Sequence, residues 1–126
     1  MKYVVVLDDE EIVEEFLEEF LREADYREIS FNYPEEAFDF IKENRAGIAL
    51  IITDNTMPLM TGVQLGKELM KAGCQNIPLI LFTGDPSPPC ADDLSNNIKI
   101  VLQKPVIRKE FMHAVKTLIG LAGDVG

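Results

Sequence analysis

Residues 48–62 read IALIITDNTMPLMTG and decide the fold. The stretch begins with an uninterrupted apolar run, which predicts a strand buried on both faces, as in a parallel sheet. This run ends at Asp54, and a helix is predicted from about Thr61 to Ala72, where Gly73 closes it. The stretch therefore predicts a strand, a loop and a helix, with a carboxylate at the carboxyl end of the strand.

The same alternation of strands and helices extends along the whole chain. Further strands are predicted at residues 3–7, 27–31, 78–82 and 98–102. Further helices are predicted at residues 10–21, 34–43, 91–96 and 108–121, of which 91–96 is short because it follows a proline-rich stretch. This pattern predicts an α/β fold, with a doubly wound five-stranded parallel sheet in the order 2-1-3-4-5 and five helices on both faces.

The chain has 126 residues, 22 acidic and 12 basic side chains, and a net charge of −10. This length predicts a single domain over residues 1–126, and the acidity argues against binding to nucleic acid or to an anionic membrane surface. No apolar run approaches the roughly 20 residues of a membrane helix, and the first run is too short for a signal peptide. Cys74 and Cys90 lie in no metal-ligand spacing. We therefore expect a soluble, cytoplasmic domain.

Most of the negative charge lies in one segment. Residues 8–23 hold two Asp, seven Glu and one Arg. Pairs of glutamates alternate there with pairs of apolar residues, so one face of the predicted helix is apolar and the other is acidic. The acidic face, which includes Glu11, Glu14, Glu15 and Glu18, is either a solvated surface or a docking surface for a basic partner.

Polar residues follow four of the five predicted strands. Asp8 and Asp9 follow the first strand, Asp54 the third, Thr83 the fourth and Lys104 the fifth. Each one alone is explained as a helix cap, a turn residue or a solvated strand end. Together they lie at one edge of the sheet, where the first and third strands are neighbours about 4.8 Å apart. Three carboxylates that converge repel one another, so a cation such as Mg²⁺ is expected between them. Mg²⁺ and a lysine can together neutralise the oxygens of a phosphoryl group while an aspartate attacks its phosphorus.

These residues resemble the receiver domain of two-component response regulators, and the resemblance extends over essentially the whole chain. The matching pieces are the acidic cluster after the first strand, the D-x-x-M-P-x-M-x-G segment at 54–62, Thr83-Gly84 and Lys104-Pro105. The family implies a flavodoxin-like fold and a role in phosphorelay signal transduction. A histidine kinase or histidine phosphotransfer domain would pass a phosphoryl group to the chain, which then switches conformation. The family implies no enzyme activity beyond self-phosphorylation and autodephosphorylation.

The resemblance also implies a phosphoacceptor and a metal site. Asp54 is expected to accept the phosphoryl group. Asp9 and Asp54 are expected to bind Mg²⁺ directly, together with the backbone carbonyl of Thr56, and Asp8 is expected to act mostly through water. Mn²⁺ is expected to substitute for Mg²⁺.

Further residues are expected to act on the phosphoryl group itself. Lys104 would hold one of its oxygens, and Thr83 would donate its hydroxyl once the group has formed. Thr56 and Asp85 sit where the family tunes the lifetime of the acyl phosphate. Val101 is a departure, because many members carry an aromatic residue three positions before the lysine, and it places aromatic gating through Thr83 in question.

Two further features concern the last third of the chain. The family implies a cis peptide at Lys104–Pro105, which proline makes accessible. The proline-rich stretch at 86–89 implies a short or displaced fourth helix on the usual output face. The chain is either a free-standing receiver or the receiver of a longer protein, such as a hybrid histidine kinase.

Three other classes of protein fit parts of the pattern. A phosphatase of the haloacid dehalogenase type also uses an aspartate, a threonine, a lysine and Mg²⁺, but it needs D-x-D after its first strand, where this chain has Asp8-Asp9. A non-catalytic binding module would explain the fold but not the complete set of polar residues. A flavodoxin-like cofactor carrier would need a phosphate-binding loop after the first strand, which the sequence does not show.

Overall fold

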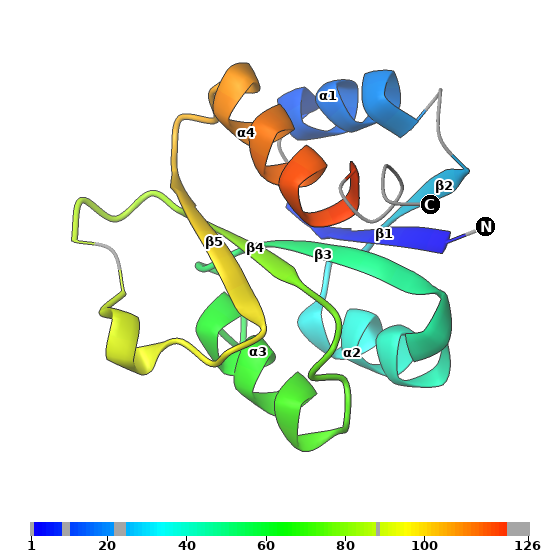
Figure 1. Cartoon of the computed structure of the whole chain (residues 1–126). Coiled ribbons are helices and arrows are strands. Elements are labelled where there is room, and N and C mark those ends of the chain that lie inside the picture. The colour runs from blue at the N-terminus through cyan, green and yellow to red at the C-terminus, as the bar shows by residue number, and fades with distance from the viewer. Residues whose placement is uncertain (1, 9–10, 22–24, 88, 121–126) are drawn as a thin grey trace.

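The computed structural model describes residues 2–8, 11–21, 25–87 and 89–120. Five strands form one parallel sheet in the order β2-β1-β3-β4-β5 (Figure 1), which confirms the predicted topology. The strands are β1 (Lys2–Leu7), β2 (Tyr26–Ser30), β3 (Ile48–Asp54), β4 (Leu79–Thr83) and β5 (Ile98–Gln103). The α-helices among the described residues are α1 (Glu11–Leu21), α2 (Pro34–Glu43), α3 (Gly62–Lys71) and α4 (Arg108–Val115).

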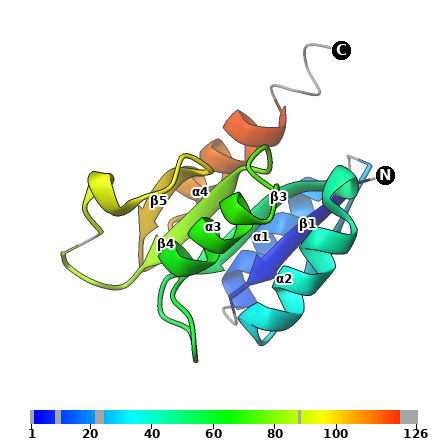
Figure 2. The same ribbon diagram turned by 90° about the horizontal axis from the view of Figure 1, so that it is seen from below.

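The helices cover both faces of the sheet, as predicted. α1 and α4 pack on one face, and α2 and α3 pack on the other (Figure 1). Figure 2 shows the sheet from the side that α2 and α3 cover, with these helices in front of it and α1 and α4 behind. Aromatic side chains join α1 to α4, since the ring centroids of Phe16 and Phe111 lie 6.2 Å apart. The sheet therefore separates two apolar cores.

β1 illustrates why the central strands lack polar alternation. Val4 and Val6 belong to the core on the α1–α4 side, whereas Val5 and Leu7 belong to the core on the α2–α3 side. Successive side chains of a strand point to opposite faces, so a strand with a core on each side is apolar throughout. The apolar runs end where the strands leave the two cores, and polar residues follow there.

The predicted helix at residues 91–96 is wrong. Among the described residues of the β4–β5 connection, the chain forms a 3-10 turn at Ala91–Asp93. A helix as short as the predicted one does not offset the cost of its nucleation. The residues that follow bond elsewhere, because Asn97 donates from Nδ2 to the carbonyl of Gly66 in α3 at 2.9 Å and Ser95 donates to Asn97. Four α-helices rather than five therefore cover the described sheet.

The last helix is also shorter than predicted. α4 ends at Val115 and continues as a π-helical turn at Lys116–Gly120. The hydroxyl of Thr117 donates to the carbonyl of His113 at 2.7 Å, and side-chain bonds of this kind distort helices. The other predicted helices and strands agree with the structure to within two residues. Across the described ranges, no helix has the length and apolar character needed to cross a membrane.

Candidate functional site

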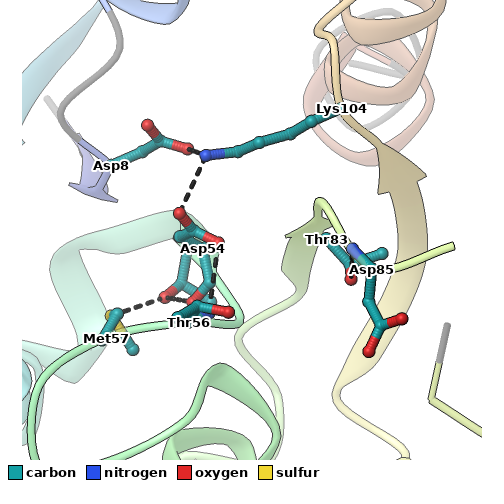
Figure 3. A network of polar contacts seen from close by, with 8 residues as sticks. Asp8, Asp54, Thr56, Met57, Thr83, Asp85 and Lys104 are labelled. Carbon is teal, nitrogen blue, oxygen red and sulfur yellow. Dashed lines mark hydrogen bonds and ion pairs between the residues drawn. The ribbon is translucent and has the colours of Figure 1, made fainter. Parts of the chain in front are cut away.

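The polar residues that follow the strands share one edge of the sheet. Asp8 directly follows β1, Asp54 ends β3, Thr83 ends β4, and Lys104 directly follows β5. Because β1, β3, β4 and β5 are consecutive in the sheet, their carboxyl ends bring these four residues to the same region (Figure 3). Asp9, the remaining predicted metal ligand, lies outside the described residues.

Lys104 joins two of these strand ends. Its Nζ lies 2.8 Å from Oδ2 of Asp54 and 3.5 Å from Oδ2 of Asp8 (Figure 3). The side chain of Asp8 is fully buried, whereas those of Asp54 and Lys104 are 20% and 19% exposed. One ammonium thus offsets the repulsion between two neighbouring carboxylates. The Lys104–Pro105 peptide is cis, which confirms the expectation from the family.

Backbone contacts fix the direction of the Asp54 carboxylate. Its Oδ1 accepts a hydrogen bond from the amide of Thr56 at 3.2 Å, while Oδ2 faces Lys104. The amide of Asn55 donates to the carbonyl of Phe82 at 2.8 Å, so bonding to β4 continues one residue beyond Asp54. The carboxylate therefore lies at the end of a paired strand, with Thr56 donating to one oxygen and Lys104 to the other.

The start of α3 explains part of the D-x-x-M-P-x-M-x-G segment. A Cβ at Gly62 would lie 2.8 Å from the carbonyl oxygen of Asp54, closer than real Cβ contacts come, so glycine is required. Thr61 caps the helix by accepting from the amide of Gln64 at 3.1 Å, and the Gln64 side chain accepts from the amide of Thr61 at 2.8 Å. This capping box and the glycine hold α3 against the backbone of Asp54.

Thr83 lies at the same edge, but its hydroxyl bonds within its own loop. Its buried hydroxyl accepts from the amide of Asp85 at 3.1 Å, and its carbonyl accepts from the amide of Lys104 at 2.8 Å. Figure 3 shows Thr83 and Asp85 side by side, apart from the contact of Lys104 with the two carboxylates. The structure thus brings Asp8, Asp54 and Lys104 into contact and holds Thr83 and Asp85 as a separate pair.

A pocket of about 370 Å³ opens beside the two carboxylates. Asp8, Asp54 and Thr56 form part of its wall. Among the described residues, no three acidic, histidine or cysteine side chains cluster closely enough to hold a metal, and Asp9 is not among them. Two carboxylates that share one ammonium still carry excess negative charge. Hard oxygen donors in a pocket with room for water fit Mg²⁺, which keeps several waters when it binds.

Another part of the pocket wall comes from a segment without a chemical motif. Phe31, Asn32 and Tyr33, between β2 and α2, line the pocket together with Met57 and Pro58. The sequence holds one indirect signal for them, because residues that follow β2 must emerge at the same edge as Asp54 in a parallel sheet. Reasoning from titratable residues alone misses this wall.

A second acidic region lies between α1 and β2. Glu14 and Glu18 line a shallow groove with Glu28 of β2. Burial, together with repulsion from Glu14 and Glu18, raises the pKa of Glu28 to about 6. Glu15 is exposed on the same helix, whereas the side chain of Glu11 lies outside the described part of the structure. The acidic face of α1 is therefore open to solvent at the positions that are described.

Comparisons with curated proteins find response regulators. A protein of Arabidopsis thaliana named as the two-component response regulator ARR21 is 34% identical over 82 residues, which cover 65% of this chain and 13% of that protein. The phosphoglycerate transport system transcriptional regulatory protein PgtA of Salmonella typhimurium is 31% identical over 104 residues, which cover 82% of this chain and 24% of that protein. The chain thus spans less than a quarter of the length of these relatives.

The fold and the family model agree with these relatives. The crystal structure of a response regulator receiver domain protein from Clostridium thermocellum has the same fold, with a TM-score of 0.75 at 21% identity and full coverage of both chains. The model of the response regulator receiver domain matches residues 4–116. With nearly the whole chain matched, the protein belongs to the response regulator receiver domain family.

Proposed function

We propose that this receiver domain accepts a phosphoryl group on Asp54 in a Mg²⁺-dependent reaction and transmits the signal by switching conformation. The observation that carries the proposal is the 2.8 Å contact between Oδ2 of Asp54 and Nζ of Lys104. An ammonium at this distance can neutralise the oxygens of a phosphoryl group attached to Asp54. The side chain of Asp54 is partly exposed, so a phosphodonor can reach it, whereas the side chain of Asp8 is fully buried and out of reach.

In the proposed reaction, a carboxylate oxygen of Asp54 attacks the phosphorus of a phosphohistidine in line with the P–N bond. The P–O bond forms as the P–N bond breaks, and the electron pair stays on the imidazole nitrogen. The ring, which carries a proton on its other nitrogen, leaves as neutral histidine. Lys104 Nζ and the amide of Thr56 already donate to Asp54 and can donate to the transferred group.

The conformational switch is assigned to Thr83. Its hydroxyl accepts from the amide of Asp85 in the unphosphorylated structure. A phosphoryl group on Asp54 offers the hydroxyl a charged acceptor, and charge-assisted hydrogen bonds are stronger than neutral ones. Movement of Thr83 toward Asp54 would carry the β4–β5 connection with it. Thr56 and Asp85, both exposed, are proposed to tune the lifetime of the acyl phosphate.

The residues beside the pocket fit a divalent metal. We propose Asp54, Asp9 and the backbone carbonyl of Thr56 as direct ligands, with Asp8 acting through water. Mg²⁺ would neutralise charge on the transferred group when bound, and Mn²⁺ would substitute. Asp8 and Asp54 also contact Lys104, so the carboxylates are held in place before a metal binds.

The proposed partner is a histidine kinase or a histidine phosphotransfer domain. The exposed carboxylates of α1 at Glu14, Glu15 and Glu18, with Glu11 beside them in the sequence, would attract a basic surface of that partner. We propose that residues 1–126 act as one cytoplasmic domain without nucleic-acid or membrane contacts. The domain would catalyse only the phosphorylation and dephosphorylation of its own Asp54. This holds whether it acts alone or within a longer protein such as a hybrid histidine kinase.

The experiment that tests this function is labelling with acetyl phosphate and Mg²⁺, followed by mass spectrometry of the intact protein. The wild type should gain the mass of one phosphoryl group, and Asp54→Asn should not. The matched control is Asp39→Asn, which changes an exposed aspartate of α2 and should label like the wild type. A wild type that gains no mass, or an Asp54→Asn variant that labels equally, would contradict the proposal.

A further inference from the structure

Basic side chains gather on α4, although the chain as a whole has a net charge of −10. Residues 108–116 hold three Lys or Arg, one His and one Glu, so this segment is positive. A groove lies along α4, and six residues line it: Arg108, Lys109, Glu110, Met112, His113 and Lys116. All of them except Met112 are exposed. The proposed function uses none of these residues, so this basic groove needs an explanation of its own.

The neighbouring helix on the same face of the sheet carries the opposite charge. Residues 14–18 of α1 hold three Glu and no basic residue, and all three Glu are exposed. Glu14 and Glu18 line a groove with β2, the edge strand, so this acidic surface extends toward that edge of the sheet. Figure 1 shows α1 and α4 side by side, and both pack on the same apolar core. An acidic and a basic surface therefore lie next to each other on one face of the molecule.

Apolar and aromatic side chains lie where the two helices meet. Phe16 of α1 and Met112 of α4 are half-buried, and both pack against the core beneath the helices. The ring of Phe16 lies 6.2 Å from that of Phe111, and the guanidinium of Arg108 lies 5.9 Å from its centroid. Aromatic residues, Met and Arg are enriched in protein interfaces, where an apolar centre is surrounded by a polar rim. The junction of α1 and α4 therefore has the composition of an interface centre, with opposite charges on its two sides.

We propose that this surface, here called the α1–α4 face, binds a second copy of the chain across a two-fold axis. The acidic residues of α1 in one copy would contact the basic groove of α4 in the other, and the reverse. In a two-fold dimer one surface serves both copies, so it must be complementary to itself. A face with one acidic and one basic half meets this condition, because rotation by 180° places each half against its opposite.

A second copy satisfies more of the α1–α4 face than an unrelated partner of one charge. A basic partner would complement α1 alone, and an acidic partner would complement α4 alone. Within the described part of the chain, no ion pair involves Glu14, Glu15, Lys109 or Lys116. The contacts between copies would therefore add ion pairs without breaking existing ones. Opposite charges that meet across an interface also fix the orientation of the two copies.

The test is sedimentation velocity of the unphosphorylated chain over roughly 10 µM to 1 mM. Salt is kept at about 0.15 M, where charges farther apart than about 8 Å are screened and contacting pairs are not. The wild type should shift from monomer to dimer as its concentration rises. One variant combines Glu14→Lys with Glu15→Lys, and the other combines Lys109→Glu with Lys116→Glu. Each should raise the dissociation constant by roughly tenfold or more, because like charges then face each other.

An equal mixture of the two double variants gives the sharper measurement. One variant has a positive surface on both helices and the other has a negative surface on both, so they fit each other at both contacts of the axis. The mixture should form a one-to-one heterodimer at concentrations where each variant alone is a monomer. The two reversals change the net charge of −10 by four units in either direction, to −6 and −14. Both variants thus stay negative, and their overall charge gives them no reason to associate.

Matched reversals on the opposite face of the sheet control for net charge. Asp39→Lys with Glu43→Lys on α2 makes the same change as the acidic reversal, at exposed positions. Lys67→Glu with Lys71→Glu on α3 makes the same change as the basic reversal, also at exposed positions. Both controls should dimerise like the wild type, and controls that weaken the dimer equally would overturn the proposal.

A separate measurement shows that the variants are folded. Circular dichroism and Tm are compared with those of the wild type for each double variant. If a double variant does not fold, the single reversals Glu15→Lys and Lys109→Glu are measured instead. Each single reversal should weaken the dimer, and their equal mixture should associate more tightly than either one alone.

Four further results would overturn the α1–α4 face as a dimer interface. The wild type could stay monomeric up to about 1 mM, or its dimer could survive both pairs of reversals. The mixture could stay monomeric, or assemblies larger than a dimer could grow with concentration, which indicates head-to-tail contacts instead of a two-fold axis. None of these results depends on whether Asp54 accepts a phosphoryl group, so the dimer is tested separately from the proposed function.

Discussion

Nζ of Lys104 and Oδ2 of Asp54 lie 2.8 Å apart although the two residues are separated by 50 positions in the chain. β4 is the single strand between β3 and β5, and it brings the ends of these strands close together. The cation therefore stands beside the proposed acceptor before any phosphoryl group arrives. A preorganised charge of this kind lowers the barrier more than one that must be recruited during the reaction.

Replacing this cation should impair both labelling and stability. Lys104→Met keeps most of the side-chain stem but leaves Asp8 and Asp54 without their shared ammonium. Labelling by acetyl phosphate should fall by roughly 100-fold, the usual effect of losing one donor to a developing charge. Without metal, the free energy of unfolding should fall by about 1–3 kcal/mol, which urea titration measures. The control Lys67→Met, at an exposed position of α3, should change neither quantity, and normal labelling of Lys104→Met would exclude this role.

The proposed metal site makes a prediction that needs no phosphodonor. Mg²⁺ that binds the folded chain should raise the free energy of unfolding by about 2.7 kcal/mol at 100 times its dissociation constant. Asp8→Asn should shift the Mg²⁺ concentration needed for this effect upward by roughly 10–100-fold, since outer ligands tune affinity by that amount. Tm measured against Mg²⁺ concentration tests this, with Asp39→Asn as the control. Equal Mg²⁺ curves for the wild type and Asp8→Asn would place the metal elsewhere.

The fold could be predicted where one physical cause acts over a continuous stretch. Val4 to Leu7 alternate between two apolar cores, so the run is apolar throughout and reads as a buried parallel strand. The prediction of a helix at residues 91–96 was wrong because a hydrogen bond to a distant part of the chain holds this segment in another conformation. Asn97 bonds to Gly66, which lies 31 positions earlier, and nothing in the segment itself reveals that bond.

The candidate site likewise contains residues that the sequence reveals and residues that only the structure reveals. The places of Asp54 and Lys104 at this edge could be predicted because each is a chemically distinctive residue at the carboxyl end of a strand. Tyr33 could not, since a tyrosine before a proline carries no chemical signal, and its place in the pocket wall depends on the sheet order. Exposure and local backbone rules, which need coordinates, identify Tyr33 and Leu59 as unusual.

The contact between α3 and β3 predicts a strong effect at one glycine. Gly62→Ala places a methyl group 2.8 Å from the carbonyl oxygen of Asp54, so the helix or the strand end must shift. Overpacking of this kind should lower the free energy of unfolding by about 2 kcal/mol, and the displaced carboxylate should label more slowly with acetyl phosphate. Gly47→Ala is the matched control, because a Cβ there meets nothing within 4 Å. Its stability should stay within about 0.5 kcal/mol of the wild type, and equal stabilities of the two variants would contradict the geometry.

The half-buried carboxyl of Glu28 predicts a stability that depends on pH. Burial, and then repulsion from Glu14 and Glu18, raises the pKa of Glu28 from 4.5 to about 6 in the folded chain. The charged form therefore destabilises the folded state above pH 6, and the penalty disappears below pH 4.5, where Glu28 is protonated in both states. Glu28→Gln should raise the free energy of unfolding at pH 8 by about 1 kcal/mol, after allowance for partial exposure.

The gain from Glu28→Gln should fade between pH 6 and 4.5, which urea titration over that range measures. A second substitution separates the two causes of the raised pKa. In a Glu14→Gln background one repelling carboxylate is gone, so the pKa of Glu28 should move back toward its ordinary value and the gain at pH 8 should shrink. Burial is the larger cause, so part of the gain should persist. A gain of the same size at pH 4 and pH 8 would show that packing, and not charge, distinguishes Gln from Glu at this position.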